Sequence, residues 1–140
     1  MFTAAERAYL QSQRLARLAT IDSLGHPQNS PIGLHFKPIS DTIDIIGWKL
    51  AASRKYRNVL ANPHVALIVD DMPVDGSPRG IEIRGRAEAR PATQEPGGSG
   101  TTVIRVHAQR IISWGLEPAD HRPGDARHFP TGRDARRAVP

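Results

Sequence analysis

Hydrophobic and polar residues alternate along much of this chain, which predicts a protein built mainly from strands. The alternation is cleanest over 80–90, where isoleucine, glycine and alanine take one face and glutamate and arginine take the other. Residues 64–69 are apolar on both faces, a pattern typical of a strand buried on both sides. Apolar runs bounded by turn residues predict further strands over 14–22, 26–37, 42–48 and 101–114.

Two short helices are expected beside the strands. Thr3 and Glu6 form the pattern of a capping box, and the alanine-rich residues around them favour a helix that ends near Ser12. A second helix is predicted to begin at Ser53 and to stop at 62–63, with a face toward the sheet made of Tyr56, Val59 and Leu60. About six antiparallel strands with one or two short helices indicate a small β-barrel of the Greek-key or split-barrel type.

The start of the second helix carries the strongest functional signal. Ser53, Arg54 and Lys55 stand on the exposed first turn of a helix that leaves a sheet edge. Backbone N–H groups and the helix dipole favour an anion at such a position, and the two cations add a guanidinium fork and a point charge. A phosphate-bearing cofactor is therefore the expected ligand. The alternative is an ordinary solvated basic helix start.

Composition limits the classes of protein to which the chain can belong. The 140 residues suit one domain over 1–116, followed by a tail over 117–140 that is rich in Pro, Gly and Arg. The chain has no cysteine, which excludes disulfides, thiolate metal sites and a cysteine nucleophile. Its six histidines include no close ligand pair, so no metal site is predicted.

The chain is basic, with a formal net charge of +5 at pH 7. Such a charge suits a nucleic-acid binder, and it equally suits an enzyme whose cofactor carries several negative charges. Aromatic residues make up 5% of the chain, which argues against a platform for base stacking. We therefore expect no nucleic-acid partner.

Residues 1–14 carry charges at Glu6 and Arg7 and have no apolar core, so they lack the pattern of a signal peptide. No apolar run reaches membrane-spanning length. The expectation is a cytoplasmic protein without a membrane partner.

Six short motifs follow one another along the chain: Gly25-His26-Pro27, Gly47-Trp48-Lys49, Ser53-Arg54-Lys55, Asn62-Pro63-His64-Val65-Ala66-Leu67, Gly85-Arg86-Ala87-Glu88 and Ile111-Ile112-Ser113-Trp114. In this order and spacing, over roughly residues 4–116, the chain resembles the pyridoxamine 5'-phosphate oxidase-like superfamily. Members of that superfamily bind flavins or deazaflavins on a split β-barrel. The resemblance implies a mainly β protein with a six-stranded antiparallel split barrel and short helices.

The resemblance also implies a homodimer with two cofactors bound in clefts between the subunits. Arg54 and Lys55 would then hold the cofactor phosphate, with Ser53 beside them. Asn58, one turn into the same helix, is a further candidate for the phosphate, although it could equally cap the helix or face solvent.

Two tryptophans match cofactor-lining positions of the superfamily. Trp48, together with Lys49, matches the residues that line the cofactor at the end of the preceding strand. Trp114 matches a tryptophan that approaches the flavin from the other subunit. Each indole is equally well explained as a core or dimer-interface side chain.

Three positions depart from the true oxidases. Ser30 stands where those enzymes carry Arg, His35 stands where they carry Lys, and Gly80 stands where they carry Gln. The loss of two cations from the implied site disfavours vitamin B6 oxidation as the activity.

The segments Gln28-Asn29-Ser30-Pro31-Ile32-Gly33 and 79–85 are more similar to the actinobacterial branch that uses the deazaflavin coenzyme F-420. Members of that branch are reductases that take a hydride from the reduced coenzyme, whose phospholactyl-oligoglutamate tail carries more negative charge than FMN. A basic groove that includes Arg54, Lys55 and Arg57 would suit such a tail. The bend over 28–31 would let backbone amides approach the ring edge.

The sequence thus predicts an oxidoreductase that uses reduced coenzyme F-420 to transfer a hydride to a small unsaturated organic molecule. No catalytic residue is assigned, because hydride transfer from a bound cofactor requires neither a triad nor a metal. Two alternatives stay open: an FMN-dependent oxidoreductase on the same fold, and a non-enzymatic dimer that binds a flavin or a haem. The substrate is not predicted, because the loops expected to form its pocket carry no recognisable signature.

Overall fold

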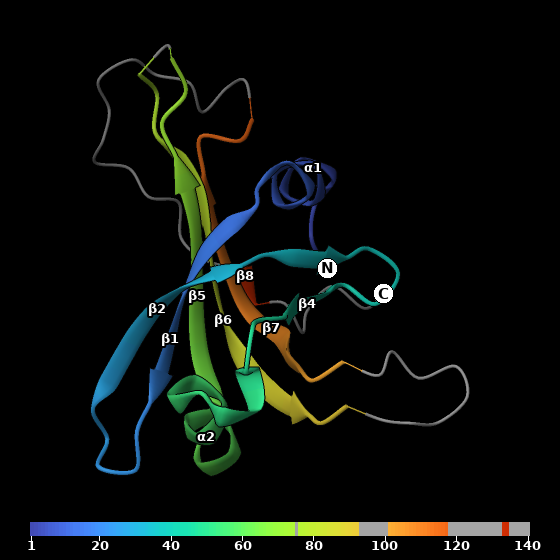
Figure 1. Ribbon diagram of the computed structural model, residues 1–140. Coiled ribbons are helices and arrows are strands. Elements are labelled where there is room, and N and C mark those ends of the chain that lie inside the picture. Colours follow the sequence, from blue (N-terminus) through green and yellow to red (C-terminus); the bar gives the residue numbers. More distant parts are fainter. Residues whose placement is uncertain (75, 93–100, 118–132, 135–140) are drawn as a thin grey trace.

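The computed structural model describes residues 1–74, 76–92, 101–117 and 133–134. Within them the chain forms two helices, a 3₁₀ turn and one antiparallel sheet (Figure 1). In chain order the elements are α1 (Ala4–Ser12), β1 (Leu15–Ile21), β2 (Pro27–Gly33), β3 (His35–Lys37), β4 (Thr42–Ile45), η1 (Leu50–Ala52), α2 (Arg54–Ala61), β5 (His64–Asp71), β6 (Arg79–Arg90), β7 (Val103–Trp114) and β8 (Arg133–Asp134).

The sheet has the strand order β2-β1-β5-β6-β7-β4-β3, and β8 pairs with β7 off this path. Strands β5, β6 and β7 form the long central part, with α1 near one end and α2 near the other (Figure 1). Within the described residues β3 pairs with β4 and β4 pairs with β7, and the sheet curls as a half-barrel around its core (Figure 1). The predicted mainly β fold with short helices is confirmed, with more strands than the six expected from the sequence.

The core lies on the inner face of this sheet. The predicted alternation in β6 is confirmed, since its isoleucines and small residues face inward and its charged residues outward. Alternating burial also marks β1 and β5. The largest side chains that are under 2% exposed include Leu18, Leu67, Ile81, Ile83 and Ile104.

Helix α1 begins with the capping box expected from the sequence. The Thr3 hydroxyl accepts from the Glu6 amide at 3.2 Å, and the Thr3 amide donates to Glu6 Oε2 at 2.8 Å. Glu6 is only 1% exposed, and its other oxygen accepts a hydrogen bond from the Ser113 hydroxyl at 2.9 Å. The cap therefore also ties α1 to the end of β7.

The single strand predicted over 26–37 is in fact two strands. Leu34 is buried between β2 and β3, and its amide donates to the Arg14 carbonyl at 3.0 Å. Strand β2 pairs with β1, whereas β3 pairs with β4. The chain must turn a corner at Leu34 to reach its second partner, and the alternation pattern carries no sign of that corner.

Three further expectations about burial were wrong. Strand β5 is buried on one face, because Ala66 and Ile68 on the other face are only half-buried. Leu60, which was predicted to face the sheet, is 65% exposed. Strand β4 ends at Ile45, so Trp48 lies beyond the sheet with 88% of its surface exposed.

The proposed tail over 117–140 lies largely outside the described residues. Arg133 and Asp134 are described, and they pair with Ile111 and Arg110 of β7. The boundary at residue 116 stays a prediction. None of the described helices combines the length and the apolar character needed to cross a membrane.

A buried ion pair joins β4 to β7. The Arg105 guanidinium donates to both carboxylate oxygens of Asp44, at 2.7 and 2.9 Å, and Asp44 is 3% exposed. The hydrogen bond from Arg105 is the main reason that the pKa of Asp44 lies below its usual range. The pair therefore stabilises the fold above about pH 4, and this contribution is lost as the pH falls through the lowered pKa.

We expect Arg105→Leu to lower the free energy of unfolding by about 2–4 kcal/mol at pH 7, because it leaves a buried carboxylate without its partner. The matched control is Arg84→Leu, which breaks a similar two-bond pair with Glu82 on the exposed face. The control should cost no more than about 1 kcal/mol. Urea unfolding at pH 7 measures both, and equal costs would contradict this account of the Asp44 pair.

Candidate functional site

The start of α2 presents backbone donors and cations together. Ser53 caps the helix, since its Oγ accepts from the Tyr56 amide at 3.3 Å and donates to the Leu50 carbonyl at 2.6 Å. The amides of Arg54 and Lys55 have no acceptor among the described residues. The Arg54 side chain is exposed and that of Lys55 is half-buried. This corner can bind a phosphate through two amides and two cations.

An exposed aromatic surface lies one short turn away from this corner. Only η1 separates Lys49 from the helix cap, and the Leu50 amide donates to the Gly47 carbonyl at 3.2 Å. Lys49 has a left-handed backbone (φ 51°, ψ 38°), and its Nζ lies 4.4 Å from the centroid of the Trp48 ring. The second face of the indole is open to a flat ligand.

Asn58 links α2 to the first two strands. Its Nδ2 donates to Thr20 Oγ1 at 3.0 Å and to Gln28 Oε1 at 2.8 Å, and Asn58 is 6% exposed. Gln28 Nε2 in turn lies 3.4 Å from Asp22 Oδ2. The described contacts of Asn58 are therefore with the protein, and they position Gln28 beside the helix. A contact of Asn58 with phosphate stays a prediction.

The candidate residues of β2 divide between two faces. Gln28 and Ser30 are half-buried on the side of Thr20, whereas Asn29 and Pro31 are exposed on the other side. Residues on opposite faces of one strand cannot all contact the same ligand through their side chains. A ligand on the outer face would meet the side chains of Asn29 and Pro31.

A carboxylate faces the cationic corner from the turn between β1 and β2. Asp22 Oδ1 accepts from the amides of His26 and Leu24 at 2.8 and 2.9 Å. The hydrogen bond from the His26 amide is the largest cause that lowers the pKa of Asp22, and the charge of Arg54 contributes in the same direction. Arg54 therefore lies within electrostatic reach of this hairpin.

Trp114 lies far from the α2 corner within one chain. It pairs with Gly80 at the start of β6, while α2 sits at the opposite end of the sheet (Figure 1). A Cβ on Gly80 would collide with the Trp114 ring, and it would also come within 2.8 Å of the Val69 carbonyl oxygen. Gly80 thus leaves the space that the indole occupies.

We expect Gly80→Ala to lower the free energy of unfolding by about 1–3 kcal/mol, because the indole and strand β5 must both shift. In a Trp114→Ala background the same substitution should cost less, since the ring is gone and only the backbone contact remains. Gly33→Ala is the control, as its Cβ would meet nothing closer than His35 Nε2 at 3.7 Å. Strictly additive costs in urea unfolding would show that Gly80 and Trp114 act separately.

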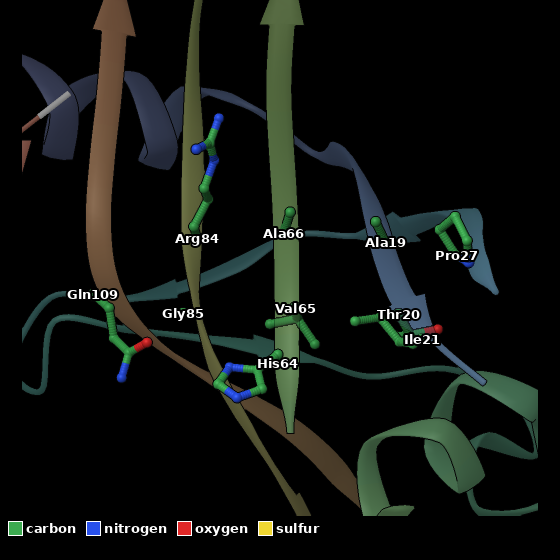
Figure 2. A pocket seen from close by; sticks show the side chains of 10 residues that line it. All are labelled: Ala19, Thr20, Ile21, Pro27, His64, Val65, Ala66, Arg84, Gly85 and Gln109. Atoms are coloured by element: carbon green, nitrogen blue, oxygen red, sulfur yellow. The ribbon is translucent and has the colours of Figure 1, made fainter. Parts of the chain in front are cut away.

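A hollow of about 300 Å³ lies on the outer face of the sheet (Figure 2). Its walls come from β1, β2, β5, β6 and β7, and Thr20 belongs both to the hollow and to the Asn58 hydrogen bonds. A bulge between β6 and β7 leaves Gln109 without a cross-strand partner in β6. This bulge borders the hollow. A side chain on Gly85 would collide with the His107 carbonyl, so this glycine permits the bulge.

A family model described as pyridoxamine 5'-phosphate oxidase matches residues 2–115. The chain belongs to this family. A curated relative, the 5a,11a-dehydrotetracycline/5a,11a-dehydrooxytetracycline reductase of Streptomyces rimosus, is 38% identical over 120 residues, which cover 83% of this chain and 84% of the relative.

Solved structures extend the family likeness to the fold. A conserved hypothetical protein of Mycobacterium tuberculosis superimposes with a TM-score of 0.66 at 22% identity, covering 95% of this chain and 94% of that one. A protein described as an F420 reductase superimposes with a TM-score of 0.53 at 24% identity, covering 70% and 88%. The predicted resemblance to the pyridoxamine 5'-phosphate oxidase-like split barrels is therefore confirmed.

The fold of this family brings some predicted site residues together and separates others. Trp48, Lys49, Ser53, Arg54 and Lys55 share one corner, whereas Trp114 stands at the far end of β7. Sequence reasoning missed the hollow and its polar residues His64, Arg84 and Gln109. The one available signal was Gly85, because a glycine inside a cleanly alternating strand often marks a bulge.

Proposed function

We propose that this protein is a reductase that uses reduced coenzyme F-420 to reduce a carbon–carbon double bond conjugated to a carbonyl in a polycyclic substrate. The observation that carries the proposal is the α2 corner, where two unbonded amides, Arg54 and Lys55 stand next to the exposed ring of Trp48. The reaction class is supported by the 38% identity to a dehydrotetracycline reductase.

The residues of this corner fit a cofactor with a phosphate and a long anionic tail. The amides and cations of the first turn of α2 would hold the phosphate, and the exposed Arg57 would extend the positive surface by one turn. The open face of the indole would contact the flat ring. The charge of Asp22 acts on Arg54 over a distance, so it would offset part of the positive charge of the corner.

The protein's part in the reaction is to bind, orient and exclude water. When bound, reduced F-420 would supply a hydride for the carbon β to the carbonyl, and solvent would supply the proton for the α carbon. Asn58 would hold Gln28, and with it β2, at a fixed distance from α2. No described side chain is assigned as a general acid.

A second copy of the chain would complete this site. Trp114 lies at the opposite end of the sheet from α2, so it reaches an α2 corner only by coming from another subunit. A homodimer is therefore part of the proposal. Sedimentation equilibrium should give twice the 15.3 kDa of one chain, and a monomer under assay conditions would remove Trp114 from the proposed site.

Turnover tests the proposed function. The purified protein is mixed without oxygen with chemically reduced F-420 and 5a,11a-dehydrotetracycline, and the return of oxidised F-420 fluorescence is followed. We expect catalysed oxidation of F-420 with formation of the reduced tetracycline. Reaction with reduced FMN but not with reduced F-420 would move the protein to the flavin-dependent class.

A further inference from the structure

Trp114 lies between two anchored neighbours at the end of the sheet. Ser113 precedes it in β7, and Gly115 follows it directly after the strand ends. Ser113 faces inward, toward α1, whereas Trp114 faces outward over Gly80. The position of the indole therefore depends on how both of its chain neighbours are fixed.

The first anchor joins Ser113 to helix α1. The Ser113 hydroxyl donates to Glu6 Oε1 at 2.9 Å, and the Thr3 amide donates to Glu6 Oε2 at 2.8 Å. Glu6 is almost fully buried, and a buried carboxylate oxygen that loses its donor cannot replace it with water. The hydrogen bond from Ser113 therefore fixes the end of β7 against α1.

The second anchor joins Gly115 to the same helix through two side chains. Gly115 packs closely, because a Cβ on it would collide with the Pro78 carbonyl oxygen and would lie 3.0 Å from the Arg79 Cα. The Arg79 guanidinium donates to both carboxylate oxygens of Asp71, at 2.7 and 3.0 Å. The Tyr9 hydroxyl donates to Asp71 Oδ1 at 2.8 Å, and the Arg79 guanidinium carbon lies 5.1 Å from the centroid of the Tyr9 ring. A chain of contacts thus runs from α1 to the residue after the indole.

The protonation states of this second anchor suit its hydrogen bonds at neutral pH. Burial, together with the hydrogen bond to Asp71, raises the pKa of Tyr9, so its hydroxyl keeps the proton that it donates. The hydrogen bond from Arg79 is the main cause that lowers the pKa of Asp71, so this carboxylate stays ionised. Donor and acceptor therefore both hold the form that the anchor requires.

Both anchors begin at one face of α1, where Glu6 and Tyr9 lie one turn apart. We propose that these two are positioning residues, which fix Trp114 through the two anchors in the orientation where it contacts the cofactor of the partner subunit. The inference rests on the proposed function for the cofactor and for the second subunit. An indole that is fixed in advance loses little conformational freedom when the cofactor binds, which raises the affinity.

The anchoring can be measured without a cofactor, because the chain has only two tryptophans. In a Trp48→Phe background, the fluorescence reports on Trp114 alone. Ser113→Ala and Tyr9→Phe each remove one hydroxyl donor and keep the rest of the side chain. We expect the two together to lower the fluorescence anisotropy and to raise acrylamide quenching by about twofold, since the ring moves more freely. A signal unchanged by these two substitutions would overturn the proposal.

A matched control separates the anchors from a general loosening of α1. Thr3→Ala removes the capping hydroxyl of the same helix, which accepts from the Glu6 amide at 3.2 Å, and leaves both anchors in place. It should lower the Tm but leave the anisotropy and quenching of Trp114 unchanged. Ser113→Thr keeps the hydroxyl and should retain the original signal. A Trp114 signal that follows the Tm in every variant would show a merely structural role and overturn the proposal.

Cofactor affinity tests whether the anchors act through the indole. With Trp114 present, Ser113→Ala together with Tyr9→Phe should weaken F-420 binding by about tenfold, which corresponds to the cost of ordering one side chain. In a Trp114→Ala background the same two substitutions should change the affinity by less than about twofold, because the ring on which they act is gone. Fluorescence titration gives all four dissociation constants. An equal loss in both backgrounds would overturn the proposal.

The cofactor-free measurements keep this result distinct from the proposed function. If the wild-type protein binds no F-420, the reductase proposal fails, and a loosened Trp114 in the anchor variants would still support the role of α1 in holding the ring. If the wild type binds F-420 and the anchor variants bind it equally well, the proposed function stands and the positioning role is overturned.

Discussion

Replacing Arg54 and Lys55 together by alanine is expected to lower the affinity for F-420 by at least about a hundredfold. In the proposed site each cation would form a charge-assisted hydrogen bond with the phosphate, and such bonds contribute about 1.5–3 kcal/mol each. Since about 1.4 kcal/mol corresponds to a factor of ten, the loss of both exceeds two powers of ten. Fluorescence titration of each apo-protein with F-420 gives the dissociation constants of the wild type and of the double variant.

The fold should survive this double substitution. Arg54 is exposed, Lys55 is half-buried, and neither has a salt bridge among the described residues. Removing such cations changes the free energy of unfolding by less than about 1 kcal/mol. Arg14→Ala with Lys37→Ala removes the same charge elsewhere and should leave F-420 affinity within about threefold. Wild-type affinity in the Arg54, Lys55 variant would mean that the phosphate binds at another place.

Asn58→Ala is expected to affect stability and cofactor binding together. The substitution removes the side-chain amide that donates to both Thr20 and Gln28. Thr20 is only 2% exposed. An unsatisfied buried polar group costs about 1–3 kcal/mol, so we expect a loss of about 2–4 kcal/mol and a Tm lower by on the order of 10 °C. F-420 should also bind more weakly, because β2 is no longer held against α2.

Leu60→Ala provides the control on the same helix. Leu60 is 65% exposed, so its truncation should change the free energy of unfolding by no more than about 0.5 kcal/mol. Calorimetry of both variants distinguishes the loss of the Asn58 hydrogen bonds from the general effect of truncating a side chain on α2. A change of Tm for Asn58→Ala that matches the Leu60→Ala change would show that the hydrogen bonds to Thr20 and Gln28 contribute no stability.

The sequence contained enough local information to predict most elements of this fold. Thr3 and Glu6 marked the first helix, Ser53 marked the second, and the alternation over 80–90 marked β6 with its inward face. Each of these signals depends on neighbours within a few residues. The corner at Leu34 was missed because it depends on which strand accepts each half of the segment, and pairing partners are remote in sequence.

The candidate site was predictable only where it is local. Ser53, Arg54 and Lys55 are adjacent in sequence, and the structure keeps them on one helix turn. Asn58 was ambiguous, because its partners Thr20 and Gln28 stand 38 and 30 residues away along the chain. The rim of the hollow combines residues from β5, β6 and β7, so it exists only after the strands have paired with a bulge at Gln109.

The measurement that tests the central claim most directly is a side-by-side titration of the purified apo-protein with F-420 and with FMN, followed by ligand fluorescence. The account predicts tight binding of F-420 and much weaker binding of FMN, because the cations of the α2 corner and Arg57 suit the longer anionic tail. A preference for FMN, or binding of neither compound, would contradict it.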